Sequence, residues 1–223
     1  MSLVGALIRR ALPPATLLRA LCRLDNQLYR AMSLASIWYG GGLHPKHRLT
    51  RYHDFFLARV HAGDRVLDLG CGNGALADDL ARERKALVTG IDQDRAAIRA
   101  AQTAHAGAGV TFIEGDARRL PGASFDVVIL SNILEHLDDR VGFLRDTVER
   151  TGAARLLIRV PLFERDWRVP LKRELGVDFR LDPTHRTEYT LEQFDAEITD
   201  AGLVIVEREV RWGEAWAECR PRP

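Results

Sequence analysis

Apolar residues in this chain gather in short runs that alternate with stretches of helical spacing. From residue 65 onward, the runs predict strands at Val66–Leu69, Leu87–Ile91, Val110–Ile113, Val127–Leu130, Leu156–Val160 and Val204–Val206. The stretches between most of them predict helices, most clearly at Gly74–Arg84, Asp94–Thr103, Asp139–Thr151 and Leu191–Ala201. Strands that alternate with helices indicate an α/β fold whose parallel sheet is covered by helices on both faces.

The N-terminal part has a different pattern. After Pro13 and Pro14, leucines recur at helical spacing and arginines take the opposite face, which predicts an amphipathic helix. We expect this helix to pack on the rest of the protein. The alternative is a helix that lies on an anionic membrane or on a partner. We therefore predict a basic helical extension over residues 1–42, ending at the glycines Gly40–Gly42, and one globular domain over residues 43–223.

Composition and charge exclude several classes of protein. The net charge of +1 gives no bias toward nucleic acid or membranes. Three scattered cysteines indicate neither a disulfide framework nor a zinc site, and a reducing compartment is the default. No apolar run approaches the ~20 residues of a membrane span. The opening MSLVGALIRR lacks the order of a signal peptide. We expect a cytoplasmic protein, and the oligomeric state stays open.

A glycine-rich loop follows the first predicted strand directly. Its sequence is Gly70-Cys71-Gly72-Asn73-Gly74, and a helix begins behind it. Each glycine costs about 0.5–1 kcal/mol relative to alanine inside regular structure, so three of them predict a sharp turn or a ligand close to the backbone. Open α/β sheets bind ligands at this kind of loop, although an ordinary strand-to-helix turn has the same appearance.

Polar residues also end the next three strands. Asp92 ends the second strand, where a carboxylate can accept both hydroxyls of a ribose. The alternative role of Asp92 is a helix N-cap, for which Asp94 is the better candidate. Asp116 follows the third strand, and Ser131 with Asn132 ends the fourth. Because parallel strands end at one edge of a sheet, we expect these side chains to share that edge.

Four segments in this order and spacing resemble the class I S-adenosylmethionine-dependent methyltransferases: VLDLGCGNG, GIDQD, EGDARRLP and FDVVILSNILEHLDD. The resemblance covers roughly Leu57 to Glu218. It implies a Rossmann-like, seven-stranded and mostly parallel sheet whose last strand is antiparallel. The final two strands would be Val204–Val210 and Trp212–Cys219. The implied cofactor is S-adenosylmethionine, and the implied activity is methyl transfer.

The resemblance also assigns cofactor-binding positions. The loop from Gly70 to Gly74 would pass beneath the methionine part, and Asp68 would hold that loop or the amino group of the cofactor. Asp92 would hold the ribose, with Gln93 beside the adenine, and Asp116 would accept from the adenine amino group near the Ala117 N–H. The positions for the methionine half are Asp68, Gly70, Cys71, Gly72, Ser131 and Asn132. Cys71 has no base nearby in sequence, so we do not expect it to act as a nucleophile.

Two other functions fit parts of this pattern. Gly70, Gly72 and Ala75 satisfy the glycine template of an NAD(P)-dependent oxidoreductase. Asp68, however, would place a carboxylate next to the pyrophosphate, and it suits a ligand that carries a positive charge. The second alternative is a catalytically inactive scaffold of the same fold that only binds the cofactor.

Two histidines are candidates for a general base in methyl transfer. His136 follows the fourth strand, and His185 lies in a polar segment before the last predicted helix. The competing interpretations are a histidine that packs the start of a helix and an ordinary polar loop. Because these histidines are not paired with carboxylates at a recognised metal spacing, we expect no metal requirement.

The methyl acceptor is expected to be a small molecule, such as a sugar or another secondary metabolite with a hydroxyl group. A quinone or lipid precursor stays open as an alternative acceptor. The fourth strand is not followed by an Asn-Pro-Pro-Tyr-like segment, which argues against methylation of a base flipped out of DNA. We expect no nucleic-acid partner.

Overall fold

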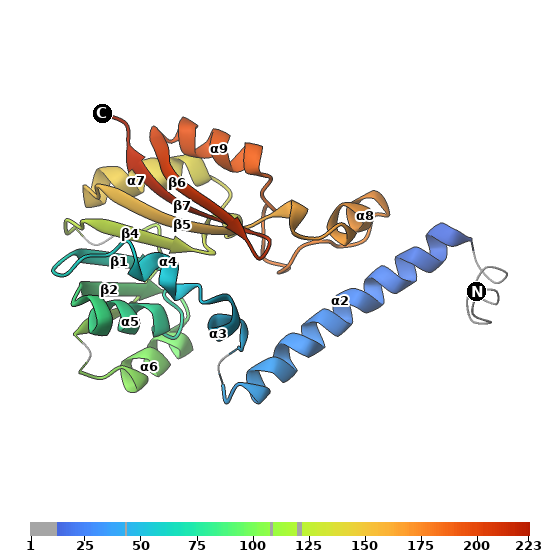
Figure 1. The fold of residues 1–223 in the computed structure, drawn as a ribbon, viewed down its shortest axis with the longest axis horizontal. Coiled ribbons are helices and arrows are strands. Elements are labelled where there is room, and N and C mark those ends of the chain that lie inside the picture. The colour runs from blue at the N-terminus through green and yellow to red at the C-terminus, as the bar shows by residue number, and fades with distance from the viewer. Residues whose placement is uncertain (1–12, 43, 108, 120–121) are drawn as a thin grey trace. The chain divides into compact units, whose positions relative to one another are not determined.

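The computed structural model describes residues 13–42, 44–107, 109–119 and 122–223 (Figure 1). The first twelve residues and Leu43, at which the globular domain was predicted to begin, lie outside the described part. The chain divides into two compact units, which we describe separately. One consists of Met1–Thr50 with Phe163–Pro183, and the other of Arg51–Leu162 with Thr184–Pro223.

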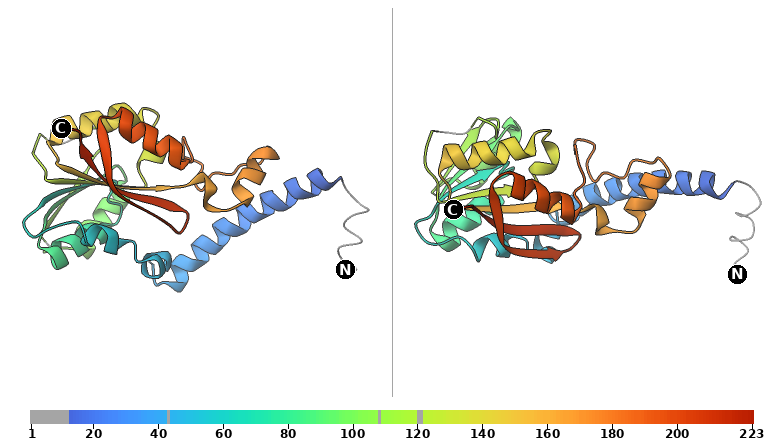
Figure 2. Two further views of the ribbon diagram at one scale, coloured as in Figure 1. Left: turned by 45° about the horizontal axis from the view of Figure 1, so that its top comes forward. Right: turned by 90° about the horizontal axis from the view of Figure 1, so that it is seen from above.

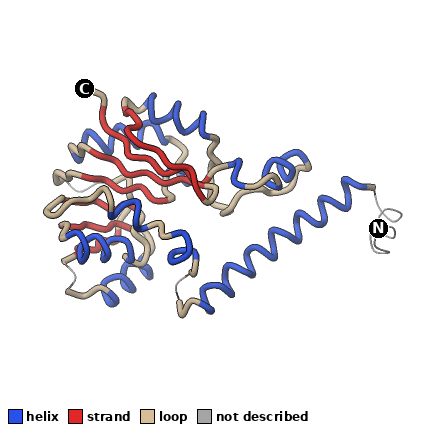
Figure 3. Tube along the Cα trace, in the orientation of Figure 1, coloured by secondary structure: helices blue, strands red, loops and turns tan. Residues whose placement is uncertain are grey.

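The larger unit contains a seven-stranded sheet in the order β3-β2-β1-β4-β5-β7-β6, which Figure 3 shows as a continuous set of strands. β7 is antiparallel to both of its neighbours, and the other pairings are parallel. This is the predicted Rossmann-like topology with one antiparallel last strand. The strands are β1 Arg65–Leu69, β2 Leu87–Asp92, β3 Val110–Glu114, β4 Val127–Ser131, β5 Arg155–Pro161, β6 Leu203–Arg211 and β7 Glu214–Pro221.

Helices cover both faces of this sheet, as predicted (Figure 2). On one face they are α4 His53–Leu57, α5 Ala75–Arg84 and α6 Arg95–Ala104, and on the other α7 Arg140–Thr151 and α9 Leu191–Asp200. Successive residues of a strand point to opposite faces. Val66 accordingly belongs to the core beneath α4, α5 and α6, whereas Leu67 belongs to the core beneath α7 and α9. The continuous apolar runs of β1, β4 and β5 reflect central strands that are buried on both sides.

The helices begin at the caps that their sequences indicate. The Asp94 carboxylate accepts hydrogen bonds from the N–H groups of Ala96 and Ala97, so Asp94 caps α6. The Thr190 hydroxyl accepts from the Gln193 N–H and caps α9. These bonds satisfy backbone donors that the first turn of a helix leaves without partners.

The last two strands differ from their predicted limits. Trp212, which was predicted to begin the final strand, lies in the turn with Gly213. Both residues have positive φ, 56° and 74°. A two-residue hairpin with positive φ at both positions matches the twist of its strands, so β6 extends to Arg211 and β7 begins at Glu214.

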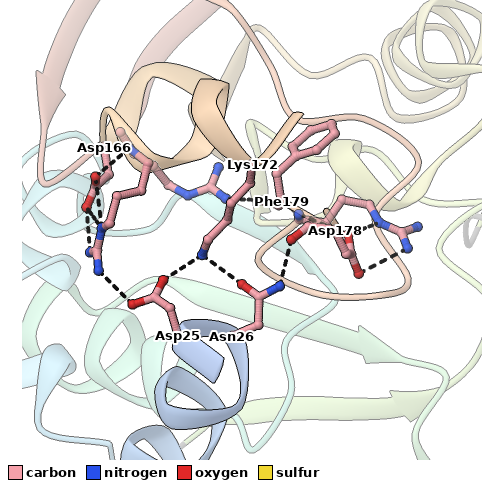
Figure 4. A network of polar contacts seen from close by, with 9 residues as sticks. Asp25, Asn26, Asp166, Lys172, Asp178 and Phe179 are labelled. Atoms are coloured by element: carbon pink, nitrogen blue, oxygen red, sulfur yellow. Dashed lines mark hydrogen bonds and ion pairs between the residues drawn. The ribbon is translucent and has the colours of Figure 1, made fainter. Parts of the chain in front are cut away.

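The smaller unit holds α2 Pro14–Tyr39, α3 Lys46–Thr50, a short 3₁₀ turn at Phe163–Arg165 and α8 Arg168–Glu174. Polar contacts join α2 to residues 168–178 (Figure 4). The Lys172 ammonium donates to Asp25 Oδ2 at 2.6 Å and to Asn26 Oδ1 at 2.7 Å, and the Arg168 guanidinium donates to Asp25 at 2.8 Å. Asp25 is the one acid of α2, and it neutralises cations from a segment more than 140 residues away. The division of domains at residues 42 and 43 stays a prediction.

Helix α2 extends beyond its predicted leucine stripe and exposes much of its apolar surface. Leu21 and Leu28 are about half exposed, and Trp38 at its end is 85% exposed, whereas Cys22 is buried. The search of the described residues found no helix that is long and apolar enough to cross a membrane.

Candidate active site

The glycine loop at the end of β1 is held by the second strand. The N–H groups of Gly70 and Cys71 donate to the Ile91 carbonyl at 2.7 and 3.1 Å. Gly70, Gly72 and Gly74 have φ values of 72°, 53° and 77°. These left-handed conformations explain the three glycines, because other residues adopt them only with strain.

Asp92 joins this loop directly. Its Oδ2 accepts from the Gly72 N–H at 2.8 Å, and its Oδ1 accepts from the Asp94 N–H at 2.8 Å. Since Asp94 caps α6, Asp92 is not the helix cap. The Asp92 carbonyl accepts from the Gly115 N–H at 2.9 Å, which ties the segment before Asp116 to the same position. Gly72, Asp92 and Asp116 therefore lie along one edge of the sheet.

Asp116 interacts with a neighbouring cation. The Arg118 guanidinium donates to both carboxylate oxygens of Asp116, with a shortest contact of 2.6 Å. These bonds lower the pKa of Asp116 to about 2. The Arg118 side chain is 69% exposed. Arg118 would have to turn aside for Asp116 to accept from an adenine, and an exposed side chain can do so. Gln93 is exposed nearby, and Ala117 is half-buried against the core.

Asp68 is buried beneath the loop, with 2% of its surface exposed. Desolvation and, to a smaller extent, the charge of Asp92 raise the pKa of Asp68 to about 7. Burial likewise raises the pKa of the Cys71 thiol, which faces Gly90. The Cys71 side chain is thus unreactive and serves in packing. Only the backbone of Cys71 is available to a ligand at the loop.

Ser131 and Asn132 end β4 in the same region. The Asn132 N–H donates to the Arg159 carbonyl at 2.9 Å, and Asn132 has a positive φ of 59°. The buried Asn132 Oδ1 has no hydrogen-bond partner among the described residues. A buried acceptor in a strained backbone conformation is typical of a ligand-binding position.

Three side chains beyond β4 form a second cluster. Glu135 and His136 lie in the 3₁₀ turn Leu134–His136, and His185 lies in the polar segment before α9. One potential ligand atom from each of the three lies within 4.8 Å of the others. The rings of His136 and His185 meet edge to face, with centroids 4.7 Å apart. The fold therefore brings together the two histidines that the sequence analysis proposed separately.

Backbone hydrogen bonds hold His185 in this position. The Glu135 carbonyl accepts from the N–H groups of Arg186 at 2.7 Å and Thr187 at 3.3 Å. Nearby, the buried Tyr189 hydroxyl donates to Glu197 at 2.7 Å, which fixes the end of the segment. The loop containing His185 is thus attached to the turn that carries His136.

The carboxyl group of Glu135 is a site residue that the sequence analysis missed. Glu135 has no exposed surface, and neither carboxylate oxygen has a hydrogen-bond partner among the described residues. Burial raises the pKa of Glu135 to about 8. The signal was present as a glutamate directly before His136, but its burial depends on β5 and the loop at residues 184–189.

Comparisons with known proteins find similarity to methyltransferases. Residues 66–150 match a family model described as a methyltransferase domain. An uncharacterised methyltransferase of Mycobacterium bovis is 43% identical over 76 residues, which are 33% of this chain and 38% of that protein. The ubiquinone biosynthesis O-methyltransferase of Vibrio vulnificus is 31% identical over 131 residues, 54% of this chain and 55% of that enzyme. The chain thus spans about half or less of the lengths of these relatives.

A solved structure supports the fold. The magnesium protoporphyrin IX methyltransferase of Synechocystis, determined with bound S-adenosylhomocysteine (SAH), superposes with a TM-score of 0.61 and 22% identity, covering 79% of this chain and 82% of that one. Residues 66–150 thus match a methyltransferase domain, and the chain has the fold of the class I S-adenosylmethionine-dependent methyltransferases.

Proposed function

We propose that this protein is an S-adenosylmethionine-dependent methyltransferase that acts on a hydroxyl group of a small molecule, such as a sugar or another secondary metabolite. The observation that carries the proposal is the hydrogen bond between the Gly72 N–H and the Asp92 carboxylate. It joins the glycine loop to the acid at the end of β2, in the arrangement that a nucleoside ligand requires. The likeness to an O-methyltransferase favours a hydroxyl acceptor.

The cofactor would lie along the edge formed by β1, β2, β3 and β4. The loop Gly70–Gly74 and Asp68 would face the methionine part, together with Ser131 and Asn132. Asp92 would accept the ribose hydroxyls through lone pairs that its two backbone bonds leave available. Gln93, Asp116 and Ala117 would surround the adenine.

His136 and His185 would serve the acceptor. In-line displacement needs the nucleophile, the methyl carbon and the sulfur on one axis, and the hydroxyl must lose its proton. We propose that these two imidazoles position the acceptor hydroxyl and promote the loss of its proton. We expect replacement of either histidine to lower turnover more than it lowers cofactor affinity. Full activity in both His136→Ala and His185→Ala would exclude them from the reaction.

Cofactor affinity should depend on the ionisation of Asp68. Its pKa of about 7 leaves most of the group protonated at pH 6 and ionised at pH 7.5, and only the carboxylate attracts the positive cofactor. We expect S-adenosylmethionine to bind about tenfold more tightly at pH 7.5 than at pH 6. Calorimetric titration of the wild type and of Asp68→Asn tests this, because the variant should bind weakly and with little pH dependence. A wild-type affinity that is independent of pH would contradict this role of Asp68.

Two experiments test the function itself. Calorimetry should detect binding of S-adenosylmethionine and of SAH, and binding of NAD(P)H alone would indicate the oxidoreductase alternative. Incubation with methyl-labelled S-adenosylmethionine and small-molecule extract should yield a labelled product for identification. Binding without any labelled product would support the inactive scaffold.

We also propose a cytoplasmic protein whose helix α2 contacts protein rather than membrane. Sedimentation with anionic phospholipid vesicles should leave the full chain in the supernatant. If the chain instead sediments with the vesicles, and if Arg19→Glu and Arg23→Glu abolish this, α2 binds a membrane surface.

A further inference from the structure

The buried carboxyl group of Glu135 has no hydrogen-bond partner among the described residues. A buried carboxyl group without a partner is costly, and proteins protonate it, pair it with a charge or bind a metal with it. Both Glu135 oxygens have no hydrogen-bond partner among the described residues, and the side chain is fully buried. The groups beside it are the imidazoles of His136 and His185, within 4.8 Å by their potential ligand atoms. The two Glu135 oxygens therefore lie beside two imidazoles, the side chains most common as metal ligands.

We propose that Glu135, His136 and His185 form a binding site for a divalent first-row transition metal ion. This replaces the expectation of no metal, which considered only spacing along the sequence. Ligand atoms around an ion with bonds of about 2.1 Å lie about 3.0–4.2 Å apart. The separations between the three groups, all within 4.8 Å, therefore need to shorten by at most about 1–2 Å, which rotations of their side chains supply.

The surroundings of the two rings suit metal ligands. His185 Nδ1 lies 2.9 Å from Glu188 Oε1, and His136 Nδ1 lies 2.9 Å from the Thr184 hydroxyl. A carboxylate that accepts from one ring nitrogen fixes the tautomer, so the other nitrogen, Nε2, carries the lone pair for an ion. Glu188 is buried as well. Glu135 and Glu188 each bring a carboxyl group to the site, and as metal-bound carboxylates the two would balance the charge of a divalent cation.

The backbone holds these ligands before any ion binds. Glu135 and His136 are neighbours in one turn, and the Glu135 carbonyl anchors the segment that carries His185. Two imidazoles and one carboxylate occupy three positions of a coordination shell and leave others open. Mixed nitrogen and oxygen donors suit Zn²⁺, Mn²⁺ or Co²⁺ better than Mg²⁺, which prefers oxygen ligands.

The role of the ion rests on the proposed function. A divalent ion lowers the pKa of a coordinated hydroxyl group. The acceptor oxygen would lose its proton to solvent and form a C–O bond with the methyl carbon as the C–S bond breaks. SAH would leave with the bonding electron pair on sulfur. The ion changes no oxidation state, and the histidines would hold it instead of taking the proton themselves.

Metal binding can be measured without activity. The full chain is treated with EDTA, dialysed and titrated calorimetrically with Mn²⁺, Zn²⁺ and Mg²⁺ in separate experiments. We expect one site per chain that binds Mn²⁺ and Zn²⁺ more tightly than Mg²⁺. Glu135→Gln should weaken Mn²⁺ binding by about 100-fold or more, and Glu188→Gln by about 10–100-fold. Co²⁺ should produce visible absorption bands in the wild type that Glu135→Gln loses.

Matched variants control for charge and for histidine content. Glu192→Gln and His61→Gln change exposed residues that are not among the proposed ligands, and both variants should bind Mn²⁺ as the wild type does. If circular dichroism shows that Glu135→Gln is unfolded, His136→Gln is tested in its place, because His136 is only half-buried. Absence of Mn²⁺ and Zn²⁺ binding in the wild type, or unchanged binding in the folded ligand variants, would overturn the site.

The outcome is separable from the proposed function. S-adenosylmethionine binding is titrated with the EDTA-treated chain, and its failure would contradict the methyltransferase proposal while leaving the metal titration valid. If both ligands bind, EDTA should abolish methyl transfer and Mn²⁺ or Zn²⁺ should restore it. Transfer that EDTA does not affect would restrict the ion to a structural role and overturn its part in the reaction.

Discussion

Gly74→Ala is expected to lower the free energy of unfolding by about 2–5 kcal/mol. Gly74 has a φ of 77°, and an added Cβ would lie 2.5 Å from the Phe112 ring and 3.0 Å from Ala101. Phe112 belongs to the core beneath α5 and α6, so neither the ring nor the helix can move freely. Chemical denaturation monitored by circular dichroism measures the loss.

Gly152→Ala is the matched control for this prediction. Gly152 also has a positive φ, 62°, but its added Cβ meets nothing within 4 Å. The free energy of unfolding of Gly152→Ala should fall only by the cost of placing alanine in a left-handed conformation, about 1–2 kcal/mol. An equal loss in both variants would mean that the collision with Phe112 contributes nothing, and that Gly74 is required for its backbone conformation alone.

The second large effect concerns Asp92. Asp92→Ala is expected to weaken binding of S-adenosylmethionine by more than about 100-fold, because two hydrogen bonds from ribose hydroxyls to a carboxylate are lost. The variant also removes the acceptor for the Gly72 N–H, which loosens the glycine loop. Calorimetric titration with S-adenosylmethionine and with SAH measures the change.

Asp94→Ala separates ribose binding from helix capping. Asp94 lies two residues further on and holds the first turn of α6 through Ala96 and Ala97. Its replacement should cost about 1 kcal/mol of stability and leave cofactor affinity within about twofold. If Asp94→Ala weakened the cofactor as strongly as Asp92→Ala, the assignment of the ribose to Asp92 would be wrong.

Local patterns predicted much of the larger unit. Six of the seven strands appeared in the sequence as short apolar runs, whereas β7 was indicated only by the family resemblance. The central strands need apolar residues because they are buried on both faces, as Val66 and Leu67 show. Asp94 was recognisable as a cap because capping depends on residues two and three positions away. The polar strand ends at Asp92 and Asp116 could be placed on one edge because parallel strands end together.

Contacts between distant segments were not predictable in this way. Nothing in the spacing of Lys172 indicates that it meets Asp25, and the phenyl ring that excludes a side chain at Gly74 comes from a different strand. The turn at Trp212 was missed because its positive φ is imposed by the pairing of β6 with β7.

The sequence by itself determined the alternation of strands and helices, the glycine loop and the acids that follow the strands, because these depend on neighbours along the chain. Only the tertiary structure decided that Glu135 is buried with no hydrogen-bond partner among the described residues, and that His185 lies beside His136. The reason is that burial and side-chain proximity between segments about 50 residues apart depend on how all strands and loops pack together, which no local pattern encodes.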